Sequence, residues 1–345
     1  MLRASVLLLL LSLCSICSDA QLSSSPARKG ETLEVVYFYC SNGVNDTKGR
    51  SDFIKFGDAL VRARIRDRVE LVYVQVDGEG DALHLAAQKI VDSRPYAVFA
   101  SSQDAMEGMR HATSTIPILF VSHIDPVMMG DVLSLSRPGV RRTGITFYAP
   151  IAAKEMEILS EAFPNIKRVG VLSDQFTILH TGLLGELAEA RQALGIDTSV
   201  FLASTLPELQ IQLRLAGAAS VDAWYVPVGD LMASDFDGTV HAMREIGKPV
   251  MYTRTNAVLK GGTLSYEPFL PEPYDILARQ LSMMLMGVDV TSIPVEHPTI
   301  FKLAVNLDTS NLRPQMKLSK SIVKRADTTV PVSEEFVVDQ RLSPR

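Results

Sequence analysis

Short apolar runs alternate with stretches that carry apolar side chains at helical spacing, and polar residues lie where the two patterns meet. In the first part of the chain the apolar runs have the length of buried strands: residues 35–40, 69–76, 97–100, 116–121 and 144–147. The helical pattern lies between them, at residues 51–65, 81–92 with Asp81 as its cap, 103–111, and from about Pro126 onward. This order predicts a parallel, doubly wound α/β sheet.

The same alternation starts again after Pro150, which interrupts the pattern. Strands are predicted at residues 168–172, 199–202, 223–226, 249–253, 262–266 and 303–307. Helices are predicted at residues 152–163, 177–194 with Gly195 closing the helix, 206–215, 232–246 and 274–286. Two sets of similar size in a chain of 345 residues predict two lobes.

Composition narrows the choice of partner. The chain is 47% hydrophobic and 21% charged, which is typical of globular proteins, and its net charge is −5. It therefore lacks the basic surface expected of a protein that binds nucleic acid or an anionic membrane. We expect neither of these partners.

The first 20 residues are predicted to be a signal peptide. Arg3 precedes an apolar run at residues 6–13, and the small-x-small sequence ending at Ala20 places cleavage after that residue. Two alternatives stay open, a membrane anchor and lipid attachment at Cys14 or Cys17. The apolar stretch is shorter than the roughly 20 residues of a membrane span, and neither cysteine follows a small residue. The protein is thus expected to be secreted to the periplasm.

Cys40 would be the single cysteine of the mature chain, so no disulfide can form within it. It lies in an apolar strand pattern, which favours a small buried residue over a catalytic thiol. The catalytic motifs of α/β hydrolases, P-loop NTPases, dinucleotide-binding enzymes and zinc proteases are absent. The six histidines have no ligand spacing. We therefore expect no catalytic centre, metal or cofactor.

Polar residues do gather directly after the predicted strands, where parallel sheets bind their ligands. The candidate ligand-binding residues are Ser41, Asn42, Ser101, Ser102, Ser122, Asp125, Ser173, Asp174, Gly229, Asp230, Tyr252, Arg254 and Tyr266. Any one of them fits a helix cap or turn equally well. Together they predict a cleft between the lobes around a small polar molecule. Arg254 or the helix start at Ser101 and Ser102 would suit a ligand carboxylate, and Asp125, Asp174 or Asp230 a ligand ammonium.

Several stretches, in order along the chain, resemble one family. They are residues 112–127 (ATSTIPILFVSHIDPV), 135–139 (LSRPG), 143–146 (TGIT), 167–172 (KRVGVL), 261–266 (GGTLSY), 294–299 (PVEHPT) and 306–309 (NLDT). They are similar to the periplasmic substrate-binding proteins of ABC transporters, whose characterised members include tryptophan-binding proteins. The resemblance departs at residues 101–104 and 174–175, where the family has Gly-Thr-Pro-like and Asn-Pro sequences. Both departures lie where the family contacts its ligand.

The resemblance implies a type I periplasmic binding protein, in which two Rossmann-like lobes with parallel sheets are joined by three hinge segments. The implied N-terminal lobe comprises residues 31–148 and 270–292, and the C-terminal lobe residues 149–269 and 293–330. The crossovers would lie near residues 148–150, 267–270 and 293–298, each of which contains a proline.

The implied function is non-enzymatic. A monomeric protein captures a small amino-acid-like ligand and delivers it to an ABC permease in the inner membrane. The alternative is a sensing module that reports to a receptor or a histidine kinase. A hydrolase that uses Asp125 or Asp174 would need a nucleophile or metal that the sequence does not offer. A transcription regulator of the same fold would need a DNA-binding segment before the first lobe, where a signal peptide is predicted.

Overall fold

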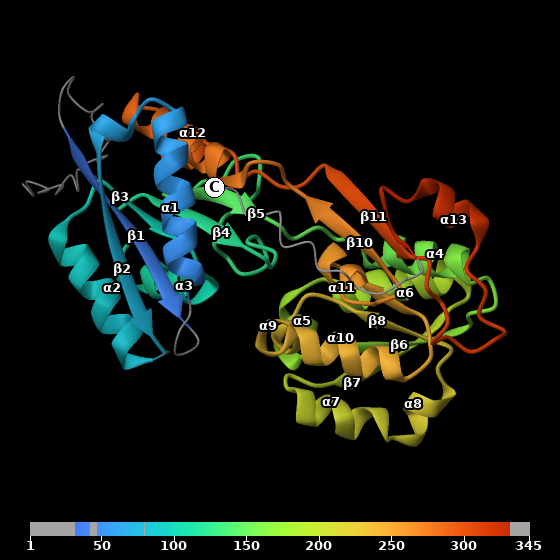
Figure 1. Ribbon diagram of the computed structural model, residues 1–345. Helices are drawn as coiled ribbons and strands as arrows, with labels where there is room; N and C mark the ends of the chain where they lie inside the picture. Colours follow the sequence, from blue (N-terminus) through green and yellow to red (C-terminus); the bar gives the residue numbers. More distant parts are fainter. Residues whose placement is uncertain (1–31, 42–46, 79, 332–345) are drawn as a thin grey trace, which may run out of the picture.

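The computed structural model describes residues 32–41, 47–78 and 80–331, which form two α/β lobes side by side (Figure 1). The sheet of the first lobe has the order β2-β1-β3-β4-β5, and all of its strand pairs are parallel. Its strands are β1 (Leu33–Ser41), β2 (Val69–Asp77), β3 (Ala97–Ala100), β4 (Ile118–Ser122) and β5 (Arg142–Thr146). Its helices are α1 (Lys48–Arg62), the 3-10 turn η1 (Arg66–Arg68), α2 (Asp81–Ser93) and α3 (Gln103–Ala112).

Strand β1 shows why this sheet is covered on both faces. Val35, Tyr37 and Tyr39 point into one apolar cluster, which contains residues of α1. The alternate residues Val36, Phe38 and Cys40 point into a second cluster, which contains residues of α2 and α3. Successive side chains of a strand point to opposite faces, so a run that is apolar at every position needs helices on both sides.

The sheet of the second lobe is larger, with the order β12-β11-β10-β9-β8-β6-β7. Only the β10–β11 pair is antiparallel in this described sheet. The strands are β6 (Arg168–Ser173), β7 (Asp197–Leu202), β8 (Ala223–Val226), β9 (Val250–Tyr252), β10 (Leu264–Phe269), β11 (Ile300–Asn306) and β12 (Thr328–Val330). The helices are α4 (Ala152–Ala162), α5 (Gln175–His180), α6 (Leu183–Leu194), α7 (Leu206–Leu213), α8 (Ala216–Ser220), α9 (Asp230–Ser234), α10 (Phe236–Glu245), α11 (Thr255–Leu259) and α13 (Lys320–Arg325).

Helix α12 (Pro273–Leu285) follows β10 but packs in the first lobe, where Leu277 and Leu281 belong to the same apolar cluster as α1. The 3-10 turn η2 (Val290–Ser292) comes next along the chain. Three short segments, at residues 147–151, 270–272 and 297–299, therefore run between the lobes (Figure 1). We call them the three links.

The approach to the third link is fastened to the first lobe. Thr143 Oγ1 donates a hydrogen bond to the carbonyl of Ile293 at 2.8 Å. Gln280 Nε2 donates to the carbonyls of Gly144, at 2.9 Å, and Pro294, at 3.0 Å. Because these contacts are largely buried, the chain becomes independent of the first lobe only after Glu296, whose backbone still pairs with β5.

Most predicted strands and helices are confirmed within a few residues, and the last predicted strand, residues 303–307, overlaps β11 and ends one residue beyond it. The helix expected from Pro126 is wrong. Met129 N donates to Asp125 O at 3.0 Å, but Gly130 then takes φ +70° and the chain turns away after one turn. The 177–194 helix is divided at Gly182 into α5 and α6, and the 232–246 helix at Asp235, whose side chain accepts from Gly238 N. Asp81 is the first residue of α2 rather than its cap, which is Gly80.

Cys40 is buried and its Sγ donates to the carbonyl of Gly78 at 3.1 Å, as suits a small core residue. No helix in the described ranges is long and apolar enough to span a membrane. The predicted signal peptide, with Cys14, Cys17 and Ala20, lies outside the described residues, as does Asn42.

Candidate functional site

The carboxyl ends of the first-lobe strands point toward α5 and α9 of the second lobe (Figure 1). These helices follow the carboxyl ends of β6 and β8. The two sheet edges thus face each other, and we call them the facing edges. All the candidate residues except Asn42 can be placed on them or in the cores behind them.

The first-lobe serines hold the backbone of their own lobe. Ser102 Oγ accepts from Ala105 N, at 3.2 Å, and from Cys40 N, at 3.1 Å, so it caps α3 and ties it to β1. Ser101 Oγ donates to the carbonyl of Phe38 at 3.1 Å. Ser41 is fully buried at the end of β1. These groups shape the first facing edge from behind.

Ser122, at the end of β4, is buried as well. Its Oγ donates to the carbonyl of Ile124 at 2.8 Å and accepts from Ile124 N at 3.2 Å. Asp125 is half-buried, and its Oδ1 accepts from Val127 N at 2.8 Å and Met128 N at 3.3 Å. Asp125 therefore caps the single turn that replaces the expected helix.

On the second facing edge, both carboxylate oxygens of Asp174 accept hydrogen bonds. Asp174 is 2% exposed, its Oδ1 accepts from Thr177 N at 2.7 Å, and its Oδ2 accepts from Thr177 Oγ1 at 2.8 Å and Asp230 N at 3.0 Å. A Cβ added at Gly229 would overlap its Oδ2, so the close approach requires glycine there. Ser173 is buried beside it, and Asp230 is exposed. Asp174 thus joins the starts of α5 and α9.

Arg254 lies just before α11 and is exposed, and no ion pair to it is found among the described residues. The start of α11 does not depend on it, because Glu267 Oε2 accepts from Thr255 N at 2.9 Å. Tyr252 is fully buried in the core, and its unpaired hydroxyl has a raised pKa because burial disfavours the charged form. Tyr266 stacks on Phe301 at 5.4 Å between ring centroids. Of these side chains, the Arg254 guanidinium is the one available to a ligand.

Each facing edge also presents an imidazole stacked on a phenyl ring. In the first lobe His123 and Phe147 lie 5.1 Å apart with 15° between their planes. In the second lobe Phe176 and His180 lie 4.3 Å apart with 28° between their planes, and Phe176 is 40% exposed. Open aromatic faces of this kind suit contact with a planar apolar group.

The surroundings keep the His123 ring neutral. Neighbouring protein atoms partly desolvate the ring, although the side chain is accessible to solvent. This desolvation is the main cause that lowers the pKa of His123 to about 4. The positive charges of Arg254 and Lys48 lower this pKa further. Arg254 belongs to the second lobe and His123 to the first, so the two facing edges are close enough to interact electrostatically.

The sequence did not single out His123, Phe147 or Phe176 as candidates. His123 and Phe147 directly follow a strand and Phe176 lies in the first turn of the next helix, the same positions that selected the polar candidates. In the parts of the chain that the structure describes, no group of three or more His, Cys, Asp or Glu side chains is arranged to hold a metal ion.

The model of the family described as ABC transporter substrate binding protein matches residues 54–330. The chain belongs to this family. A curated relative, the tyrosine-binding protein of Clostridioides difficile, is 23% identical over 262 residues, 75% of this chain and 74% of that protein.

Two solved structures share the fold of this family member. An ABC domain from Streptococcus pneumoniae in complex with L-Trp has a TM-score of 0.71 at 20% identity, covering 87% of this chain and all of that chain. The leucine-binding protein LivK of Thermotoga maritima has a TM-score of 0.55 at 14% identity, covering 76% and 86%. The protein therefore has the type I periplasmic binding fold, with two lobes built on parallel-dominated sheets.

Proposed function

We propose that this protein captures an amino acid with an aromatic side chain between its facing edges and delivers it to an ABC importer. The observation that carries the proposal is the pair of aromatic–imidazole stacks, one on each facing edge, beside the exposed Arg254. The naming of two relatives for tyrosine binding and for an L-Trp complex supports the same class of ligand.

Three parts of such a ligand have matching groups on the facing edges. A guanidinium binds a carboxylate through two parallel hydrogen bonds, so Arg254 would hold the ligand carboxylate. Asp125 uses Oδ1 for its own turn, and its carboxylate would also receive the ligand ammonium. The neutral His123 ring and Phe147 would stack on the ligand ring, with Phe176 approaching it from the other lobe. None of these contacts requires a covalent bond to form or break, so the proposed role is that of a binding protein and not an enzyme.

Delivery of the ligand to a permease requires that the closed, ligand-bound protein differ in shape from the empty protein. The three links would allow the lobes to rotate, and ligand held from both edges would favour the closed arrangement. A monomer secreted to the periplasm, after removal of residues 1–20, could then present the closed form to an inner-membrane permease. The same closure could report to a sensor kinase instead, and permease and ATPase genes beside this one would favour transport.

The test is a thermal-shift and calorimetric screen. L-tyrosine, L-tryptophan and L-phenylalanine are expected to bind, with tyramine and 4-hydroxyphenylpropionate as controls that lack the carboxylate and the amine. A true ligand at about 100 times its dissociation constant stabilises the folded state by roughly 2.7 kcal/mol. Stabilisation by L-leucine or ribose, with none by the aromatic amino acids, would contradict the proposed ligand class.

A further inference from the structure

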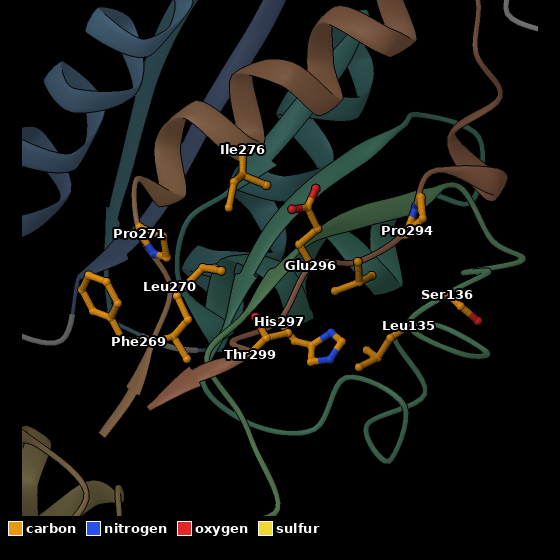
Figure 2. Close-up of a pocket in the computed structure, with 12 residues that line it drawn as sticks. Leu135, Ser136, Phe269, Leu270, Pro271, Ile276, Pro294, Glu296, His297 and Thr299 are labelled. Carbon is orange, nitrogen blue, oxygen red and sulfur yellow. The ribbon is translucent and has the colours of Figure 1, made fainter. Parts of the chain in front are cut away.

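A cavity lies at the links rather than on the facing edges. Its volume is about 740 Å³, within the range of small-molecule sites. Figure 2 shows Phe269, Leu270 and Pro271 along one side and Leu135 and Ser136 on the other. Ile276 and Glu296 lie between the two sides, with the Glu296 carboxylate turned toward α12. We call this cavity the link pocket.

The lining of the link pocket is mostly apolar, and two of its large apolar side chains are exposed. Phe269, at the end of β10, is 42% exposed, and Ile300, its partner at the start of β11, is 45% exposed. Large apolar side chains that remain exposed next to one another mark a binding surface more often than single exposed ones do. Lys302 lies over the Phe269 ring, with Nζ 5.9 Å from the centroid, and keeps one side of the ring oriented.

The charge of the pocket wall is balanced. The Glu296 carboxylate pairs with the guanidinium of Arg279 on α12, so it presents no uncompensated negative charge. The remaining polar groups are the Ser136 and Thr299 hydroxyls and the His297 ring. Such a wall disfavours a strongly charged solute, which would lose its hydration without a charged partner. It suits an uncharged aromatic molecule with one hydrogen-bonding group.

The walls of the link pocket come from segments on both sides of the links. Phe269, Leu270 and Pro271 belong to the second link and the strand before it, and His297, Thr299 and Ile300 to the third link and the strand after it. Ile276 and Ser136 belong to the first lobe, to which residues 293–296 are also fastened. Any rotation of the lobes must move one set of walls relative to the other.

We propose that the link pocket is a second binding site, for an uncharged aromatic amphipathic molecule, and that its occupation shifts the balance between open and closed lobes. A molecule that fits one arrangement of the walls better than the other moves the equilibrium by its difference in affinity. The shift rests on the proposed function, because it needs lobes that move, whereas binding to the link pocket does not.

The probe for binding is N-phenyl-1-naphthylamine, which is neutral, aromatic and fluorescent in apolar surroundings. We expect one saturable site per chain. Ile300→Glu places a charge among the apolar walls and should weaken binding at least about tenfold. Ser136→Trp fills the pocket without adding charge and should weaken it as well. Ile211→Glu is the matched control, because Ile211 is an isoleucine of α7 with 59% exposure outside the pocket.

Unsaturable fluorescence, or equal binding by Ile300→Glu and Ile211→Glu chains with unchanged melting temperatures, would overturn the site. Arg254→Ala should leave probe binding unchanged, and loss of binding there would mean that the probe occupies the facing edges instead. For the shift, small-angle scattering should show a radius of gyration that changes with probe in the natural chain and not in Ile300→Glu. Saturating probe without any change would overturn the coupling. Failure of the proposed function would appear separately, as an amino-acid screen without ligands while the probe still binds.

Discussion

The two facing edges use the same residue type after a strand in different ways. Asp174 in the second lobe is buried and accepts three hydrogen bonds that join α5 to α9. Asp125 in the first lobe is half-buried and caps one turn through a single oxygen. The comparison teaches that the number of donors and the degree of burial separate a carboxylate that holds the fold from one that can also serve a ligand.

The largest expected effect is a loss of stability on replacing Asp174, the buried carboxylate of the second lobe. Asp174→Ala should lower the free energy of unfolding by about 3 kcal/mol, because it removes the acceptor of the buried Thr177 N–H and hydroxyl and of the part-buried Asp230 N–H. Urea denaturation measures the change, and Asp125→Ala is the matched control with an expected loss of about 1 kcal/mol. Equal losses for both variants would remove the distinction between the two aspartates.

Arg254→Ala should act on binding alone. The side chain is exposed and supports no hydrogen bond of α11, so the melting temperature should stay unchanged. The affinity for the aromatic amino acid should fall by about 1.5–3 kcal/mol, the usual contribution of a hydrogen bond to a charged group. Calorimetry measures it, with Arg214→Ala, at an exposed arginine after α7, as the control. An unchanged affinity would remove Arg254 as the carboxylate partner.

Asp125→Asn sharpens the comparison from the first lobe. Asn caps a turn about as well as Asp, so the free energy of unfolding should change by less than about 0.5 kcal/mol. If the ligand ammonium meets this carboxylate, as proposed, the dissociation constant should still rise about tenfold to a hundredfold. Measuring melting and affinity on the same preparation separates the two roles. A variant that keeps its affinity would leave Asp125 as a cap, with the exposed Asp230 as the next residue to test.

The smallest expected effect concerns the proximity of the lobes. The folded pKa of His123 is about 4, below the ordinary value of 6.5, so between these values the unfolded chain binds more protons and falling pH favours unfolding. Loss of the Arg254 charge should raise this pKa by a fraction of a unit, since that charge opposes protonation of the ring. NMR titration of His123 in the natural chain and in Arg254→Ala measures it. Identical titrations would show that the facing edges do not approach closely in solution.

Patterns along the chain predicted the fold well because strands such as β1 contain an unbroken apolar run, residues 35–40, which is typical of a strand covered on both faces. They failed after Pro126, where Asp125 and the proline are typical of a helix start but Gly130 ends the first turn. Helix starts carry strong signals, whereas the length of a helix depends on packing further along. The division of residues 177–194 at Gly182 has the same origin.

The site was harder to predict from sequence than the fold. The candidate list was chosen by position after a strand, and position alone does not tell which side chains turn back to their own backbone. Ser102, Ser122 and Asp174 do so, and Tyr252 turns into the core. Position after a strand also does not tell whether an arginine is paired with a carboxylate. Only the folded structure shows that Arg254 is exposed and that no ion pair to it is found among the described residues.

The fastening of residues 293–296 by Thr143 and Gln280 has a mechanical consequence. Because the second lobe is free only beyond Glu296, the proposed rotation would have its pivot beside the first lobe, and the second lobe would act as a long lever. Strand β7 and helix α7 lie at the end of that lever, far from the links (Figure 1). A small angular change at the pivot therefore produces its greatest displacement at this outer rim. Paired spin labels placed on α7 and α2 would read the angle with the highest sensitivity that the molecule offers.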